Sequence, residues 1–252
     1  MKFAVQLYSL RGHVKTGADL LALFPKIKAL GFDGVEFAGY VNLEAAVLRK
    51  ALDDAGLVAV GTHIGLENYL PENLEATLSF CKTLGMKYAG VGGAPHGTPE
   101  EAAATAAVYA AARQAAADEG IVLYYHNHCG EFEAFDDGSL AIDVIKEACP
   151  LELDTYWSFC AGVENESYIK QNKEHICLVH IKDGINHKPK ALGEGECDLA
   201  AVVRGAKAIG LEWLVLENDD PEPDGLSDIA RSMVWLKANA STLPDSGSVS
   251  TP

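Results

Sequence analysis

Short apolar runs alternate with longer amphipathic stretches along almost the whole chain. The runs at residues 3–7, 58–63 and 88–91 have the length and composition of strands that are buried on both faces. Between such runs, apolar residues recur at helical spacing, as they do in residues 19–30. The alternation predicts a series of strand–helix units.

The full pattern contains eight predicted strands, each followed by a predicted helix. The strands cover residues 3–7, 34–37, 58–63, 88–91, a run that starts at 121, 151–154, 177–181 and 213–217. The helices cover residues 19–30, 42–55, 71–84, 99–119, 139–148, 164–173, 199–209 and 226–238. Five strands follow a glycine that is expected to end the preceding helix as a C-cap: Gly31, Gly56, Gly85, Gly120 and Gly210.

Strict alternation of strands and helices is typical of an α/β protein with a parallel sheet. Eight units predict closure into a (β/α)8 TIM barrel over residues 1–240. An open, doubly wound sheet is the alternative, but it usually carries a glycine-rich phosphate loop after its first strand, and none follows Leu7. Residues 241–252 are polar and rich in Ser and Pro, so we expect a disordered tail.

The acidic balance of the chain argues against some classes of partner. The 252 residues carry a formal net charge of −16, whereas nucleic-acid binding needs a concentrated positive surface. No run approaches the roughly 18 apolar residues of a membrane span, and the N-terminal segment reads as a strand and not as a signal peptide. The six cysteines are scattered without a CxxC pair, as in a cytoplasmic protein with reduced thiols.

Polar side chains gather where the predicted strands end, which in a TIM barrel is the active face. The clearest case is IVLYYHNHCGEFE, residues 121–133, because an apolar strand finishes there in two histidines. Singly, such residues more often cap a helix or bond to a neighbour. Together they predict one cluster of imidazoles and carboxylates at the barrel mouth. Its candidates are Glu36, His63, His126, His128, Asp154, His180, Lys182, Asp183, Glu217 and Asp219.

One or two imidazoles combined with two carboxylates form a mixed nitrogen–oxygen site for a divalent metal. Mn²⁺, Mg²⁺, Co²⁺, Fe²⁺ and Zn²⁺ all accept such ligands, so ligand type alone does not choose among them. A metal at an open site polarises a hydroxy-carbonyl substrate and acidifies the neighbouring C–H bond. A carboxylate or an imidazole then removes the proton.

Seven motifs in chain order resemble the xylose-isomerase-like TIM barrels, in particular the sugar phosphate isomerase/epimerase group. That group is similar to inosose dehydratase, hydroxypyruvate isomerase, tagatose-type 3-epimerases and endonuclease IV. The motifs are QLYSLR (6–11), GFDGVEFAG (31–39), YHNHCGEF (125–132), LDTYW (153–157), HIKDG (180–184), GEGECD (193–198) and LEND (216–219). Each motif is weak alone, but their order is typical of the superfamily, and the resemblance spans residues 2–239.

The resemblance implies a divalent metal, with Mn²⁺ or Mg²⁺ expected first, and it implies the ligands. By motif these fall on His126, Asp154, His180 and Glu217. Many relatives have Glu where this chain has His126, which leaves three arrangements open. His126 is the fourth ligand, or Glu131 reaches back from the loop, or three residues and water hold the metal. The strand position favours His126.

The resemblance also implies roles around the metal. The expected catalytic residues are His128, which lies two positions beyond the fifth-strand ligand, together with Glu217 and Lys182. The expected substrate contacts are His63, Glu131, Trp157, Lys182 and His96. Trp157 would stack on the apolar face of a sugar ring, although packing beneath a loop explains it equally well. A surface position is an equal alternative for His96, and Glu36 is either functional or a polar residue of the barrel interior.

The expected function is therefore a metal-dependent isomerase or epimerase of a small keto or aldo sugar, acting through an enediolate. We expect an unphosphorylated substrate, because Lys182 is almost alone as a basic residue near the strand ends. The alternative is a lyase or dehydratase that eliminates from a keto-inositol or a 3-keto sugar. An endonuclease IV-like nuclease and a non-catalytic binding barrel are remote alternatives. Similar proteins commonly form dimers or tetramers, so a homo-oligomer is also expected.

Overall fold

The computed structural model describes residues 1–240 and contains a closed parallel barrel. Around the ring the strands run β1–β2–β3–β4–β5–β6–β7–β10, and β10 pairs with β1 to close it. Val5 of β1, for example, lies opposite Val35 on one side and Leu216 on the other. The predicted TIM barrel is confirmed, and the predicted tail, residues 241–252, lies outside the described residues.

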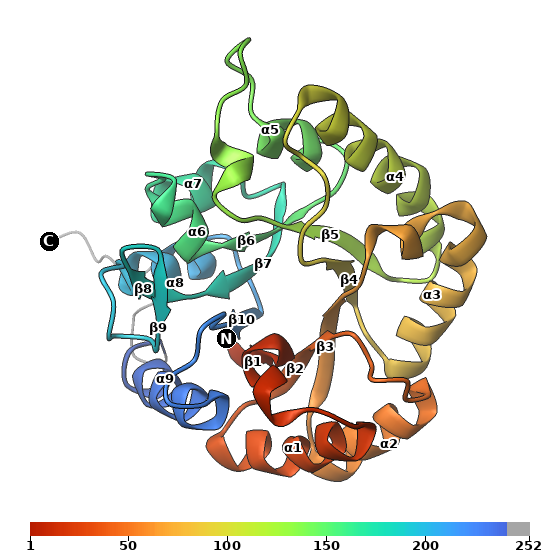
Figure 1. Cartoon of the computed structure of the whole chain (residues 1–252), viewed down its shortest axis with the longest axis vertical. Helices are drawn as coiled ribbons and strands as arrows, with labels where there is room; N and C mark the ends of the chain where they lie inside the picture. Colours follow the sequence, from red (N-terminus) through yellow and green to blue (C-terminus); the bar gives the residue numbers. More distant parts are fainter. Residues whose placement is uncertain (241–252) are drawn as a thin grey trace, which may run out of the picture.

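The helices surround the strands as an outer ring, which Figure 1 shows in a view down the barrel. The barrel strands are β1 (Lys2–Gln6), β2 (Gly34–Ala38), β3 (Val58–His63), β4 (Tyr88–Val91), β5 (Val122–His126), β6 (Leu151–Asp154), β7 (Ile176–Ile181) and β10 (Trp213–Leu216). The helices are α1 (Gly17–Leu30), α2 (Ala45–Ala55), α3 (Pro71–Leu84), α4 (Pro99–Asp118), α5 (Ala141–Lys146), α6 (Thr155–Cys160), α7 (Asn165–Gln171), α8 (Leu199–Ala208) and α9 (Gly225–Asn239). Short 3₁₀ turns cover Leu7–His13, Leu66–Tyr69 and Gly130–Phe132.

Helix ends follow the signals in the sequence. The Thr16 side chain accepts a hydrogen bond from the Asp19 amide and the Asp19 carboxylate accepts from the Thr16 amide, which together form a capping box for α1. The Asp198 side chain accepts a hydrogen bond from the Ala201 amide and so caps α8. All five predicted stop glycines adopt a positive φ, as left-handed C-cap residues do.

Helix α2 begins three residues later than the sequence predicted. Val41 and Asn42 both adopt a left-handed backbone, with φ of 49° and 57°, so Asn42 belongs to a turn and is not the N-cap. Asn tolerates this conformation well, whereas a β-branched Val does so only under strain. The predicted helix start at residue 42 was wrong, and Glu44 occupies the N-cap position.

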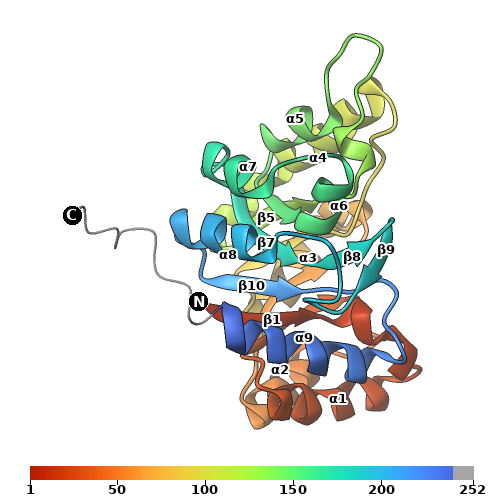
Figure 2. The same cartoon turned by 90° about the vertical axis from the view of Figure 1, so that its left-hand side faces the viewer.

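Two elements beyond the carboxyl ends of the strands were not predicted. Helix α6 starts directly after β6, because the Asp154 carboxylate accepts hydrogen bonds from the amides of Tyr156 and Trp157. A hairpin of β8 (Asp183–Ile185) and β9 (Lys188–Lys190) follows β7 and projects beyond the barrel in Figure 2. It turns at Asn186 and His187, both of which have positive φ.

The barrel interior changes from apolar to polar along its axis. Its apolar part is formed by Ala4, Val60, Tyr88, Tyr124, Leu178, Trp213 and Val215. Gly34 of β2 pairs with Ala4, and Glu36 lies two residues further toward the carboxyl end on the same face. The polar part of the interior thus lies nearer the carboxyl ends of the strands than the apolar part does. Within residues 1–240, no helix combines the length and the hydropathy that crossing a bilayer requires.

Candidate metal centre

Four ligand atoms converge at the carboxyl ends of adjacent strands, and we call these residues the upper cluster. They are His126 Nε2 at the end of β5, Asp154 Oδ2 at the end of β6, His180 Nδ1 in β7, and Glu217 Oε2 directly after β10. All four side chains are buried, and the four atoms lie within 4.8 Å of one another. The structure therefore brings together the four residues that the motifs predicted as ligands.

The spacing of the upper cluster is compatible with a bound metal ion. His126 Nε2 lies 3.3 Å from Asp154 Oδ2 and 3.7 Å from Glu217 Oε2. His180 Nδ1 lies 3.1 Å from Glu217 Oε2 and 3.9 Å from Asp154 Oδ2. Ligand atoms bound at roughly 2.1 Å to a tetrahedral metal are about 3.4 Å apart. The four distances bracket that value, so the residues present fit a divalent ion.

Lys182 places its ammonium against the carboxylates of the upper cluster. Its fully buried Nζ lies 3.3 Å from Asp154 Oδ2 and 3.1 Å from Glu217 Oε2, and it also donates to Asp219 Oδ2. Burial lowers the pKa of Lys182, but the three carboxylates outweigh burial and raise it above its usual value. The ammonium is also 5.2 Å from the centre of the Trp157 ring, within reach of a cation–π interaction.

The same charges keep the ligand carboxylates ionised. Burial raises the pKa of Asp154 and of Glu217, but Lys182 and the nearby imidazoles outweigh burial and lower both pKa values. For His180 burial lowers the pKa, and the charges of Glu152, Glu217 and Glu36 raise it well above its usual value. The centre is rich in anionic oxygen, which favours a divalent cation.

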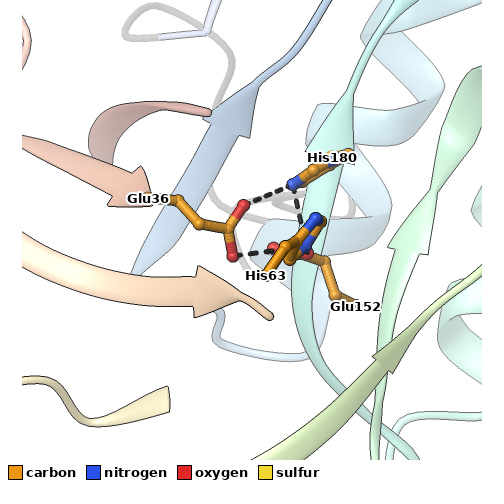
Figure 3. Close-up of side chains that lie close together, drawn as sticks. All are labelled: Glu36, His63, Glu152 and His180. Carbon is orange, nitrogen blue, oxygen red and sulfur yellow. Dashed lines mark hydrogen bonds and ion pairs between the residues drawn. The ribbon is translucent and has the colours of Figure 1, made fainter. Parts of the chain in front are cut away.

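Beneath this centre lies a second group, Glu36, His63, Glu152 and His180, which we call the lower cluster (Figure 3). His180 Nε2 lies 2.7 Å from Glu36 Oε2 and 3.1 Å from Glu152 Oε2. His63 Nε2 lies 2.7 Å from the same Glu152 oxygen. Two of these separations are 2.7 Å, shorter than the roughly 3.4 Å expected between ligand atoms on a tetrahedral metal, so charge-assisted hydrogen bonds join this group in the structure.

Glu36 has further partners that complete its hydrogen bonding. Gln6 Nε2 donates to Glu36 Oε2 at 2.9 Å, and the Tyr124 hydroxyl donates to Oε1. His180 thus turns Nε2 toward Glu36 and Glu152 and Nδ1 toward the upper cluster. A metal-binding histidine usually donates its second ring N–H to a carboxylate in this way, which fixes the tautomer and the ring orientation.

A cavity of about 440 Å³ opens over the upper cluster. It is lined by Tyr8, Ala38, His63, Gly92, His126, His128, Trp157, Glu217 and Asp219. His128 lies beside Trp157, with ring centres 5.9 Å apart, and beside His126 at 5.1 Å. Burial and the neighbouring His126 lower the pKa of His128, so its imidazole is neutral near pH 7 and able to accept a proton.

Three predicted substrate contacts, Glu131, His96 and Lys182, lie apart from this cavity lining. The buried Glu131 carboxylate accepts hydrogen bonds from the Tyr125 hydroxyl at 2.8 Å and from the His128 amide at 2.9 Å. His96 is partly exposed, and its Nδ1 lies 2.8 Å from the Ala94 carbonyl and 3.6 Å from Glu131. Glu131 supports the backbone that carries His128, and the structure groups His126, not Glu131, with the other expected ligands.

Sequence reasoning missed Glu152, Gln6 and Tyr124 as members of the polar interior. Glu152 had a readable signal, because it lies two residues before Asp154 in LELD and therefore on the same face of the strand. A glutamate between two leucines of a strand predicted to be buried is itself unusual. Glu36, which the sequence left between a functional and an interior role, belongs to the lower cluster.

Asp183, another strand-end acid, organises a loop. Its carboxylate accepts hydrogen bonds from the amides of Gly184, Gly193, Gly195 and Cys197. A Cβ at position 195 would lie 2.0 Å from Asp183 Oδ1, so glycine is needed there. These hydrogen bonds explain two motifs together, because Asp183 of HIKDG binds backbone amides of GEGECD and fixes the loop between them.

The fold and these two clusters define a class of protein, a TIM barrel with a mixed imidazole–carboxylate centre at its mouth. A family model described as xylose isomerase-like TIM barrel matches residues 24–239. Because the match covers most of the chain, the protein belongs to this family. This confirms the family that the seven motifs predicted.

Several solved structures share the fold over nearly their full length. A sugar phosphate isomerase/epimerase from Parabacteroides distasonis is 21% identical, with a TM-score of 0.76 and 94% of both chains covered. An L-ribulose 3-epimerase is 18% identical, with a TM-score of 0.75 and coverage of 96% of this chain and 95% of that one. A family 2 AP endonuclease from Brucella melitensis is 16% identical, with a TM-score of 0.75 and coverage of 94% and 98%. No curated protein matches this chain.

Proposed function

We propose that this protein is an enzyme, a divalent-metal-dependent isomerase or epimerase of a small keto or aldo sugar. The observation that carries the proposal is the metal-compatible spacing of the upper cluster directly beneath a cavity of about 440 Å³. That volume is in the range of small-molecule sites. The family and the sugar-processing enzymes among its structural neighbours support the same reading.

His126, Asp154, His180 and Glu217 would hold the ion, with Mn²⁺ or Mg²⁺ expected first. When bound, the metal supplies electrophilic polarisation of the substrate carbonyl and of the neighbouring hydroxyl. The proton is then moved between carbon atoms, or between the two faces of one carbon, through an enediolate.

The chain's own groups divide this work. Glu217 and His128 both line the cavity and both are able to accept a proton, so they are the proposed acid–base residues. Lys182 provides an ammonium beside Glu217 that stabilises negative charge on a substrate oxygen. His63 and Trp157 line the cavity and are proposed to bind the sugar hydroxyls and the apolar ring face.

The cavity favours an unphosphorylated substrate, and the cysteines favour a cytoplasmic enzyme. Its lining in residues 1–240 includes two carboxylates, Glu217 and Asp219, and neither Lys nor Arg. The lining therefore offers a phosphate group, or the backbone of a nucleic acid, no Lys or Arg side chain to bind it. The six cysteines are free thiols, as expected of a reducing compartment.

Incubation of the Mn²⁺-loaded enzyme with a panel of ketoses and aldoses in D₂O tests the proposal. Nuclear magnetic resonance should show deuterium entering next to the carbonyl together with an isomeric sugar. Formation of an enone chromophore without an isomer would instead assign a lyase. A more than about tenfold preference for sugar phosphates in kcat/KM would overturn the substrate class. Absence of exchange with every sugar, in protein that retains its metal, would overturn the isomerase.

A further inference from the structure

We propose that Lys182 is an internal cation that competes with the metal for its oxygen ligands, and that Asp219 receives the ammonium when the metal binds. The inference rests on the proposed metal centre and adds to it a positioning role for Asp219. It makes metal loading the event that places a positive charge on the wall of the substrate cavity.

The competition follows from shared atoms. Lys182 Nζ donates to Asp154 Oδ2 and Glu217 Oε2, which are the same two oxygens that belong to the upper cluster. Asp154 offers no other oxygen, because its Oδ1 accepts from the Tyr156 amide at 2.9 Å and from the Trp157 amide at 2.8 Å. An ammonium and a divalent ion therefore draw on the same lone pairs.

Asp219 is placed to hold the displaced ammonium. Its Oδ2 already accepts from Lys182 Nζ, so the exchange requires only that Nζ give up its other two partners. Arg11 Nη2 donates to the Asp219 carbonyl at 2.5 Å and so ties down the backbone at this position. The ring of Trp157 offers a second favourable surface to the ammonium.

Because Asp219 lines the cavity, the exchange would bring the ammonium to the substrate. The Asp219 side chain is 27% exposed, whereas those of Asp154 and Glu217 are 0% and 5% exposed. An ammonium confined to Asp219 has N–H groups free to meet a substrate hydroxyl or a developing oxyanion. A divalent ion wins the exchange because its attraction to two carboxylates is twice that of a single charge at equal distance.

Calorimetric titration of Mn²⁺ into metal-free protein, at fixed pH and salt, tests the exchange without reference to activity. Lys182→Met should bind Mn²⁺ about tenfold or more tightly than the wild type, because the competitor is gone. The matched control is Lys190→Met, which removes the same charge from an exposed pair with Glu222 on the β8–β9 hairpin and should change the affinity less than about twofold.

Asp219→Asn should weaken Mn²⁺ binding by about tenfold, because the displaced ammonium loses its partner. In the Lys182→Met background the same substitution should change the affinity by less than about threefold, since Asp219 acts through the lysine. An equal effect of Asp219→Asn in both backgrounds would reduce Asp219 to a remote charge and overturn the proposal.

The failure of this inference is separable from failure of the metal centre. Wild-type protein that binds no Mn²⁺ would overturn the centre itself. Wild-type protein that binds Mn²⁺, together with a folded Lys182→Met variant of equal or weaker affinity, would overturn only the exchange. If the Lys182→Met variant does not fold without metal, an unchanged Mn²⁺ affinity of the Asp219→Asn variant still overturns the proposal.

Discussion

The upper and lower clusters each contain two imidazoles and two carboxylates and share His180, yet their geometry differs. In the upper cluster four separations between ligand atoms range from 3.1 to 3.9 Å. In the lower cluster the closest separations are 2.7, 2.7 and 3.1 Å, which are the lengths of hydrogen bonds. Histidines and carboxylates in proximity therefore do not by themselves make a metal site. The two 2.7 Å contacts of the lower cluster are what set it apart from the upper one.

The difference arises from where the residues lie in the barrel. The upper cluster comes from the ends of four neighbouring strands, β5, β6, β7 and β10. The lower cluster joins strands across the interior, β2 and β3 with β6 and β7, at a level where Gln6 and Tyr124 also reach Glu36. His180 thus hydrogen-bonds through Nε2 to Glu36 of the lower cluster, and its Nδ1 faces Glu217 of the upper cluster.

Replacement of the shared histidine should have the largest effect. His180→Ala removes a ligand from the upper cluster and a donor from the lower one, so we expect Mn²⁺ affinity to fall by more than about 100-fold, beyond the range of outer-shell changes. Calorimetry on the metal-free protein measures it. His96→Ala, a histidine outside both clusters and the cavity lining, is the control. Mn²⁺ binding within tenfold of wild type in the His180 variant would show that the upper cluster is not the metal centre.

Removal of Glu36 should mainly cost stability. Glu36→Ala leaves the buried donors of Gln6, Tyr124 and His180 without their acceptor, and breaking a buried network of this kind costs about 3–5 kcal/mol. Urea unfolding of the metal-free protein measures the free energy. Glu36→Gln retains an acceptor oxygen and should be milder. An unfolding free energy equal to that of the wild type would mean that the lower cluster is not a hydrogen-bonded layer.

The sequence predicted the upper cluster and left the lower one incomplete. Each expected ligand lies at or beside the carboxyl end of a strand inside one of the seven motifs, and the family resemblance singled out these four among the strand-end residues. The bond from His180 to Glu36 joins residues 144 positions apart and depends on barrel closure, which no local pattern encodes. Glu152 was different, since its face was readable from the spacing to Asp154. The α6 helix and the β8–β9 hairpin were missed because both are set by caps and turns at the barrel rim.

Replacement of Glu152 distinguishes a lower cluster that is a hydrogen-bonded layer from one that is a second metal site. Glu152→Gln keeps the shape but removes the charge that accepts from His180 and His63, so Mn²⁺ affinity should fall about 10- to 100-fold. The stoichiometry should be one ion per chain in both proteins. Two ions per wild-type chain and one per variant chain would instead make the lower cluster a metal site of its own and would remove the distinction drawn from spacing.

The smallest expected effect is a pH dependence of opposite sign for two quantities. As pH rises, the stability of the metal-free protein should fall and the affinity for Mn²⁺ should rise. Because the pKa of His180 is raised well above its usual value, the metal-free protein holds this residue as an imidazolium at neutral pH. Its contribution to stability is present in full below its unfolded pKa of about 6.5 and is lost as pH rises through the folded pKa. Mn²⁺ must displace the Nδ1 proton, so metal affinity should rise by about tenfold per pH unit over the same window.

Asp154 and Glu217 should not contribute to that slope, because their lowered pKa values keep them ionised throughout. Titrations in buffers of different ionisation enthalpy should therefore show about one proton released per Mn²⁺ bound near neutral pH. Thermal unfolding of the metal-free protein should show stability falling as pH rises. A pH-independent affinity without proton release would place the metal away from His180 Nδ1. Both clusters would then be hydrogen-bonded layers, and the contrast in spacing would carry no functional meaning.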